Sequence, residues 1–190
     1  MRQILPDGLV VVSPHLDDAI LSLGASIARA TSEGGHVTVL TVFGGEPTSE
    51  LPAGGWDRRG GFATEGEAVR ARRAEDEAAC VVVGAVSARL RFSEIDYVGE
   101  REEEPVWEAV CAAVSHAAAV LLPGFPQTNP DHAWLTATLV GRGLPCERIG
   151  FYAEQPYRYR ERGRLPRPEG PRVGREIGRA SCRERVYVLV

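Results

Sequence analysis

A short segment near the amino terminus carries one imidazole and two carboxylates within four residues. His15, Asp17 and Asp18 follow directly after an apolar run at residues 9–12. One aspartate can be explained as the N-cap of the next helix, but a single cap does not account for both. Adjacent carboxylates repel each other unless a cation or a proton lies between them, and His nitrogen with Asp oxygen is a typical zinc ligand pair. The segment therefore indicates a divalent metal site, with helix capping as the structural alternative.

A second polar segment, residues 129–132, follows another apolar run at residues 119–122 and begins another predicted helix. Together with His15 and Asp18, the imidazole of His132 would make a set of two nitrogens and one carboxylate. Three protein ligands and one free position for water are typical of catalytic zinc sites rather than structural ones. The two segments together therefore predict a catalytic metal centre.

Two aspartates remain beside the three predicted ligands. Asp17 is free to act as a general base for water, whose pKa a bound metal lowers towards ~7. Asp131 has two equally plausible roles, as the N-cap of its helix or as the partner that orients an imidazole.

Predicted strands and helices alternate along the chain. Short apolar, β-branched runs predict strands, and stretches with helical periodicity predict the helices between them. The predicted strands cover residues 9–12, 37–43, 88–92, 119–122 and 148–153. The predicted helices cover about residues 20–29, 67–83, 105–114 and 133–140, and a long loop covers 44–66.

This alternation predicts a Rossmann-like, doubly wound α/β fold, with about five mainly parallel strands in a three-layer αβα arrangement. In such sheets ligands bind outside the carboxyl ends of the strands, so both polar segments should meet at one edge. His36 precedes a strand and so lies at the opposite edge, and His116 ends a helix. We interpret these two histidines as structural or surface residues.

The composition indicates one soluble domain and excludes several classes of partner. The chain has 190 residues, and residues 1–157 hold 12 Arg and 22 acidic residues, a net charge of −10 that argues against a nucleic-acid surface. No apolar run reaches the ~18–20 residues of a membrane helix, and no secretory signal is recognisable, so we expect a cytoplasmic protein without a membrane partner. The four cysteines form no CxxC pair, which disfavours a thiolate zinc site.

The carboxyl-terminal part has a different composition. Residues 158–190 hold 10 Arg and 4 acidic residues, a net charge of +6, and much of this segment is also rich in Pro and Gly. We predict that it is an extended tail outside the domain formed by residues 1–157. Residues 176–186 resemble the translation of a sequencing adapter, and we predict that they are an artefact rather than part of the fold.

The order of four motifs resembles that of the PIG-L (LmbE-like) family. Members of this family are zinc-dependent hydrolases that remove acetyl from N-acetylglucosaminyl and related groups. The motifs here are a strand followed by His-x-Asp-Asp at 15–18, an Arg-x-x-Glu helix at 72–75, Asn-Pro-Asp-His at 129–132, and residues 151–157. They span residues 9–157, and a carboxyl-terminal portion that is usual in the family has no counterpart here.

The resemblance implies that His15, Asp18 and His132 hold Zn²⁺ and that Asp17 is the base. It also implies that the substrate is a small N-acetyl sugar conjugate rather than a nucleic acid. Three further residues match positions near the substrate in relatives, namely Arg72, Asp96 and Glu46. Their structural alternatives are a surface ion pair for Arg72 and solvated loop positions for the other two.

One departure from the family pattern concerns catalysis. Relatives usually carry His where this chain has Asn129, and that His is thought to stabilise the tetrahedral oxyanion. An amide can still donate a hydrogen bond, but it cannot transfer a proton. Because losing one oxyanion donor typically costs ~10²–10³ in rate, we expect an enzyme that works with an altered rate.

Two other classes of function remain open. A nucleotide-binding protein would need a Gly-rich turn after the first strand, where residues 14–17 instead read Pro-His-Leu-Asp. A non-catalytic or truncated relative could keep the fold as a sugar-binding or partner module, and Asn129 is the feature that favours it. The metal, the oligomeric state and the exact sugar are not determined by the sequence.

Overall fold

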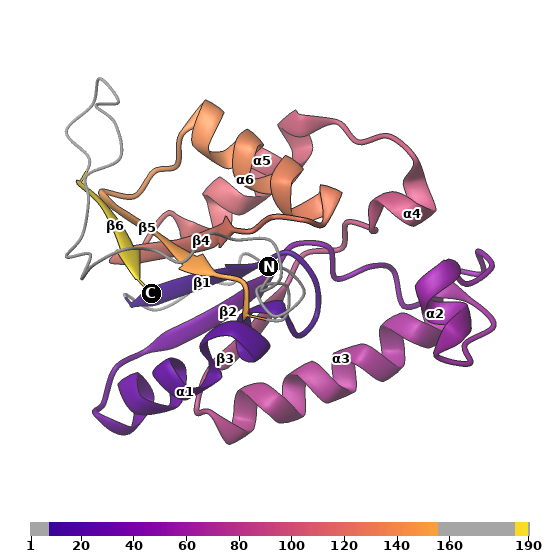
Figure 1. The fold of residues 1–190 in the computed structure, drawn as a ribbon, viewed down its shortest axis with the longest axis horizontal. Coiled ribbons are helices and arrows are strands. Elements are labelled where there is room, and N and C mark those ends of the chain that lie inside the picture. Colours follow the sequence, from indigo (N-terminus) through magenta and orange to yellow (C-terminus); the bar gives the residue numbers. More distant parts are fainter. Residues whose placement is uncertain (1–7, 156–184, 190) are drawn as a thin grey trace, which may run out of the picture.

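A computed structural model of the chain describes residues 8–155 and 185–189. Six strands form one parallel sheet in the order β3-β2-β1-β4-β5-β6 (Figure 1). The strands are β1 (Leu9–Ser13), β2 (Val37–Thr41), β3 (Val86–Arg89), β4 (Ala119–Phe125), β5 (Arg148–Ala153) and β6 (Arg185–Leu189). The helices are α1 (Asp18–Ser32), α2 (Gly55–Arg59), α3 (Glu65–Val82), α4 (Ile95–Val98), α5 (Glu103–Val114) and α6 (Pro130–Arg142). The predicted α/β fold with a parallel sheet is confirmed.

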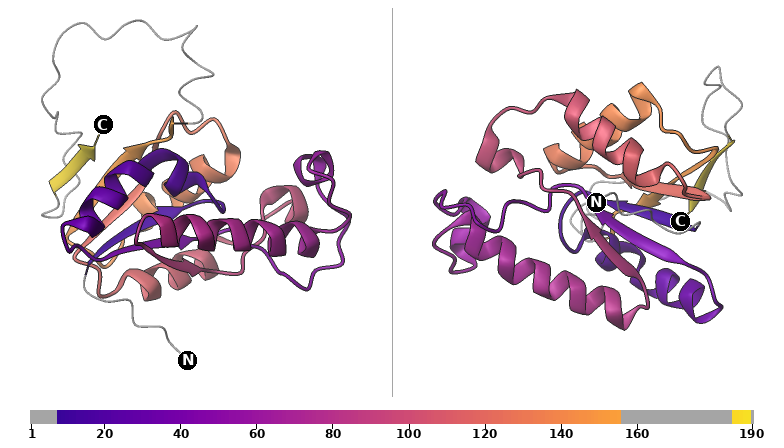
Figure 2. Two further views of the ribbon diagram at one scale, coloured as in Figure 1. Left: turned by 90° about the horizontal axis from the view of Figure 1, so that it is seen from below. Right: turned by 180° about the vertical axis from the view of Figure 1, so that it is seen from behind.

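Helices cover both faces of the sheet and give it three layers (Figures 1 and 2). Helices α1 and α3 pack on one face, and α5 and α6 pack on the other. The short helices α2 and α4 lie in the connections that follow β2 and β3. These two connections therefore leave from the edge of the sheet where the parallel strands end.

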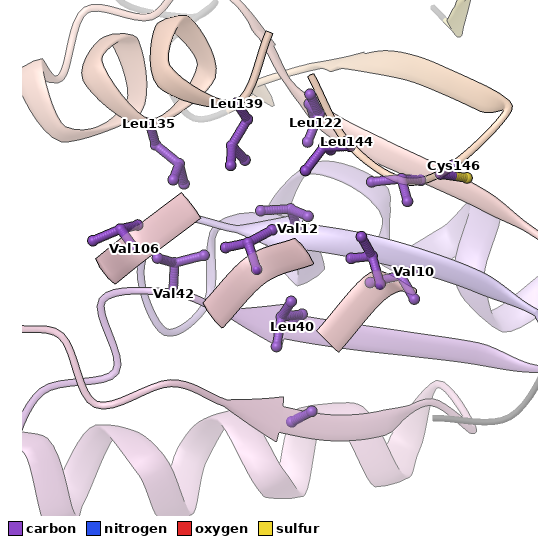
Figure 3. Close-up of a cluster of buried hydrophobic side chains, with 14 of the residues drawn as sticks. Val10, Val12, Leu40, Val42, Val106, Leu122, Leu135, Leu139, Leu144 and Cys146 are labelled. Carbon is purple, nitrogen blue, oxygen red and sulfur yellow. The ribbon is translucent and has the colours of Figure 1, made fainter. Parts of the chain in front are cut away.

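Side chains of the central strands alternate between the two faces. In β1, Val10 and Val12 belong to the core under α5 and α6 (Figure 3). Val11 packs towards α1 and α3 on the other face. All three are at most 1% exposed, which explains why the strand is a continuous apolar run. Each such side chain contributes about 1.5–3 kcal/mol by its burial.

The strand order reverses at β1, which pairs with β2 on one side and with β4 on the other. The connection after β1 therefore leads to α1 on one face, and the connection after β4 leads to α6 on the other face. Such a reversal separates the two loops and is where open α/β sheets bind ligands. Both polar segments singled out from the sequence follow these two strands.

The structure differs from the sequence prediction in several element bounds and in two added helices. Strand β3 begins at Val86, two residues before the predicted start, because Gly84 at φ +71° ends the preceding helical region and returns the chain to the sheet. The predicted loop 44–66 contains α2, and α4 was not predicted. Both are helices of at most five residues, too short to show a helical period.

A sixth strand lies in the segment that we predicted to be a tail. Strand β6 pairs in parallel with β5 over residues 185–189, so the structure joins these residues to the sheet. The run Val-Tyr-Val-Leu at 186–189 has the β-branched and aromatic composition of a strand. The rest of the predicted tail and most of the adapter-like segment lie outside the described residues, and the domain boundary stays a prediction.

Within the described ranges, no helix is both long enough and apolar enough to cross a membrane.

Candidate metal centre

The loop after β1 is held by backbone and side-chain hydrogen bonds that fix His15 and Asp18. The buried Ser13 hydroxyl donates to the His15 carbonyl (2.7 Å) and accepts from the Ala19 N–H (3.0 Å). The His15 N–H donates to Asp18 Oδ2 at 3.0 Å. Asp17 is the N-cap residue of α1 but makes no capping bond with its side chain. Helix capping therefore does not explain the paired aspartates.

The second segment brings its imidazole to the same place. His132 lies in the first turn of α6, is fully buried, and meets the loop after β1. The three atoms His15 Nδ1, His132 Nε2 and Asp18 Oδ2 form a triangle with sides of 3.0, 3.1 and 3.2 Å. The structure thus brings together the three residues that were selected as ligands, although His132 lies more than a hundred positions from the other two in the sequence.

The outer nitrogen of each imidazole contacts a second carboxylate. His15 Nε2 lies 2.9 Å from Asp131 Oδ2, and His132 Nδ1 is bonded to Glu154 Oε1. Because carboxylates only accept hydrogen bonds, these outer nitrogens carry the hydrogens. When both imidazoles are neutral, as zinc binding requires, the inner nitrogens direct their lone pairs at one point, together with an oxygen of Asp18. This is the carboxylate–histidine arrangement that supports metal ligands.

The distances suit a zinc ion. Ligands of a tetrahedral zinc ion lie about 2.0–2.2 Å from it and hence roughly 3.3–3.6 Å from one another. The observed separations of 3.0–3.2 Å need an adjustment of only a few tenths of an ångström. The donor set, its spacing and its outer carboxylates therefore fit zinc.

The same carboxylates control protonation of the two imidazoles. Burial lowers the pKa of His15, but its hydrogen bonds to Asp131 and Asp18 outweigh burial and raise the pKa above the ordinary 6.5. For His132, the bonds to Asp18 and Glu154 likewise outweigh burial and raise its pKa. Burial opposes ionisation of Asp18, yet its contacts with both imidazoles hold its pKa well below the usual range. Without a metal, the raised pKa values of His15 and His132 therefore favour protonation of the imidazoles beside the Asp18 carboxylate.

Zinc binding should release protons, because zinc needs neutral imidazoles and both pKa values are raised. At pH 6.5 we expect about one proton or more to leave per zinc bound, and the apparent affinity should rise about tenfold per pH unit for each proton released. Calorimetric titration in two buffers with different ionisation enthalpies measures this number. A binding enthalpy that does not depend on the buffer would contradict the protonation of the metal-free site.

A second group of potential ligands, His15, Glu94 and Asp131, has ligand atoms within 4.8 Å of one another. A protein cation already occupies this side, since the guanidinium of Arg101 donates to Asp131 Oδ1 at 2.6 Å. Burial opposes ionisation of Asp131, but its bonds to His15 and Arg101 lower its pKa to about 2. This second group is therefore neutralised by the protein itself, and the first is the better metal site.

Asp17 is exposed beside this centre. Partial desolvation by the surrounding protein, with the Asp18 carboxylate adding to it, raises its pKa to about 7. Its φ of 105° lies in the left-handed region, where only a few residue types, Asn and Asp among them, occur with any frequency. Strained backbone of this kind is concentrated at functional sites.

The two alternatives for Asp131 are distinguished by its contacts. Its carboxylate bonds His15, whereas the helix is capped by Asn129, whose Oδ1 accepts the Asp131 N–H at 2.9 Å. Asp131 therefore orients an imidazole and is not the cap. The cap uses only the oxygen of the Asn129 amide.

The three residues matched to substrate positions lie in different surroundings. Arg72 donates to Asp57 and to Glu94 Oε1 (2.8 Å), and its charge acts on the nearby Asp17. This ion-pair network includes a bond from the Tyr97 hydroxyl to Asp57.

Glu46 is bonded within its own loop to Thr48 (2.9 Å) and lies 3.4 Å from Arg91, so it is not part of the metal centre. Asp96 is exposed on α4, where its Cβ lies close to Gly54. In the segment around α4, Glu94 rather than Asp96 lies near His15. A substrate role for Glu46 and Asp96 stays a prediction.

Sequence reasoning missed three residues of the centre, namely Glu154, Arg101 and Glu94. Glu154 directly follows β5 and is 1% exposed, and its Oε2 also accepts the Gln127 N–H at 2.9 Å. The rule that polar residues after a strand are candidates could have selected it. No comparable signal pointed to Arg101, which follows a short helix. His36 and His116 are both exposed, in agreement with the surface interpretation.

Comparison with known proteins gives consistent matches. The family model for GlcNAc-PI de-N-acetylase (PIG-L) matches residues 10–140. A 1D-myo-inositol 2-acetamido-2-deoxy-alpha-D-glucopyranoside deacetylase from Saccharomonospora viridis is 30% identical over 135 residues, which cover 65% of this chain and 47% of that protein. The chain thus spans about half the length of this curated relative.

Solved structures agree with the fold. The A40926 pseudoaglycone deacetylase Dbv21 superposes with a TM-score of 0.67 at 30% identity, over 88% of this chain and 72% of that one. A deacetylase of the teicoplanin biosynthesis pathway has a TM-score of 0.67 at 25% identity, over 88% and 75% of the two chains. Each of these relatives is a deacetylase by name.

Proposed function

Because this chain belongs to the PIG-L family, we propose that it is a metal-dependent hydrolase that removes acetyl from an N-acetylated amino sugar or a related amide. The observation that carries this proposal is the convergence of His15 Nδ1, His132 Nε2 and Asp18 Oδ2 within 3.2 Å of one another. These residues would hold zinc. When bound, zinc supplies a Lewis acid that lowers the pKa of water and polarises the acetyl carbonyl.

Asp17 is proposed to move the proton. Its carboxylate accepts a proton from the attacking water as the oxygen forms a bond to the carbonyl carbon. It then gives this proton to the leaving nitrogen as the C–N bond breaks, so that the products are acetate and a free amine. Desolvation raises the pKa of the Asp17 carboxyl in the metal-free chain, which makes its carboxylate a stronger base than a fully solvated one.

Asn129 is proposed to donate a hydrogen bond to the oxyanion of the tetrahedral intermediate. The oxygen of the Asn129 side chain caps α6, which fixes this side chain at the start of the helix. Asp131 and His132, which belong to the centre, lie in the first turn of the same helix. The amide nitrogen then supplies the donor, and the helix N-terminus adds a favourable dipole for negative charge. This assignment leaves all proton transfer to Asp17.

The proposed substrate class comes from the relatives. One is a deacetylase of an acetamido sugar joined to inositol, and another acts on a pseudoaglycone. An N-acetyl sugar joined to a larger group is therefore the first class to test. Arg72 is the leading contact for its polar groups, because it lies near Asp17 and is 21% exposed.

The test is a direct assay of the zinc-loaded protein with N-acetylglucosaminyl conjugates. We expect acetate and primary amine to appear in equal amounts, to vanish when a chelator removes the metal, and to return with zinc. A second candidate, a non-catalytic sugar-binding relative, is favoured by Asn129, which replaces the His that relatives usually carry. Stoichiometric zinc without hydrolysis of any conjugate would contradict the enzyme and support that candidate.

A further inference from the structure

Arg101 is a buried cation next to the proposed metal centre. Its side chain is 6% exposed and follows α4 in the chain. It donates to Asp131 Oδ1 at 2.6 Å, and two of its other nitrogens donate to the Ser93 carbonyl at 2.8 and 3.2 Å. The guanidinium is therefore held by the Asp131 carboxylate on one side and by the Ser93 backbone carbonyl on the other.

Two aromatic rings fix the plane of this guanidinium. Its central carbon lies 3.9 Å from the centroid of Phe43, just after β2, and 5.6 Å from that of Trp134 on α6. A cation over an aromatic face is stabilised further when water is excluded. Arg101 thus connects the segments after β2 and β3 with the helix that carries His132, and has little freedom to move.

The carboxylate of Asp131 connects Arg101 with His15 through hydrogen bonds. While Oδ1 accepts from Arg101, the other oxygen, Oδ2, accepts from His15 Nε2 (2.9 Å) and from the Ile95 N–H (3.3 Å). Turning the carboxylate would break these bonds together. Removing Arg101 would also leave a carboxylate that is 3% exposed without its compensating charge. The direction of the His15 ring then depends on a residue that does not touch it.

We propose that Arg101 is a positioning residue that acts through Asp131 to aim His15 Nδ1 at the metal. This proposal rests on the proposed function. Outer partners of metal ligands are worth about 10–100-fold in metal affinity. Arg101 contacts the outer partner Asp131 rather than a metal ligand, so its effect on metal affinity should depend on the presence of Asp131.

The experiment is a double-mutant cycle on zinc affinity, measured by competition with a chromophoric chelator. Arg101→Met keeps most of the apolar stem and removes the charge and donors, and Asp131→Asn removes the carboxylate. We expect each single variant to lose about 10–100-fold in zinc affinity. The double variant should lose no more than Asp131→Asn alone, because Arg101 has nothing to act on once the carboxylate is gone. The visible spectrum of the Co²⁺-substituted protein should change in both single variants.

Arg142→Met is a matched control. Arg142, at the end of α6, likewise lies over an aromatic ring, 4.5 Å from the ring centroid of Trp107, and pairs with a carboxylate, that of Glu104, but it has no contact with the centre. Its loss should leave zinc affinity and the Co²⁺ spectrum unchanged. Arg101→Lys keeps the charge but not the planar fork, and should lie between wild type and Arg101→Met.

Unchanged zinc affinity in folded Arg101→Met, or losses that add up in the double variant, would overturn the proposal. If Arg101→Met does not fold, as judged by circular dichroism, Arg101→Lys replaces it in the same cycle and the same two outcomes decide. The failure of the proposed function looks different, because wild-type protein would then bind no zinc at the centre or would bind it without hydrolysis.

Discussion

His15→Ala is expected to abolish stoichiometric zinc binding while the protein stays folded. His15 supplies one of three ligand atoms, and a third of the ~10–16 kcal/mol typical of zinc binding corresponds to a loss of about 10²–10⁴ in affinity. Hydrolysis of any acetylated substrate should fall with it. The measurement is zinc content after dialysis at a fixed free zinc concentration, by elemental analysis.

His116→Ala is the matched control, because His116 is exposed in the turn after α5 and makes none of the contacts of the centre. It should retain one zinc per chain. Thermal melting of both metal-free variants separates loss of the ligand from loss of the fold. Full zinc occupancy in folded His15→Ala would remove the ligand assignment.

Asp17→Asn is expected to separate metal binding from chemistry. Asn is close to Asp in shape and also tolerates a φ of 105°, so the loop should keep its conformation. The variant should bind zinc with near wild-type affinity, because Asp17 contributes none of the three ligand atoms. Turnover should fall by about 10²–10⁴, the usual contribution of a general base.

Glu33→Gln serves as the control for removing one carboxylate from the same part of the chain. Glu33 is exposed at the end of α1 and pairs only with Arg29 among the described residues. Its removal should leave kcat unchanged. Equal turnover in Asp17→Asn and wild type would refute the role of base, whatever the zinc content of the two proteins.

Much of the fold could be predicted from the sequence because local patterns and tertiary packing agree. Strand β1 is apolar on both faces since Val10 and Val11 pack under helices on opposite sides of the sheet. The structure differs from the predicted elements where local signals are weak. A five-residue helix such as α2 shows no period, and β6 lies in a segment whose Arg-rich flank indicated a tail.

The residues that come together in the candidate site could also be predicted in part from the sequence. The rule that parallel strands present their carboxyl ends at one edge predicts from the sequence alone that His15 and His132 lie close together. The direct contacts of Asp131 and Asn129 could not be predicted, because capping and orienting roles suit both residue types. Only the position of His15 relative to α6 distinguishes them.

The sequence by itself determined the residue types, the order of strands and helices, and therefore the edge of the sheet at which a metal could bind. Tertiary structure alone decided which atoms face inward, because the tautomers of His15 and His132 depend on carboxylates that are distant in sequence. The tertiary structure also places Arg101 against Asp131, and this cation neutralises the second group of potential metal ligands. The physical reason is that electrostatic interactions depend on distances of a few ångströms, which sequence spacing does not specify.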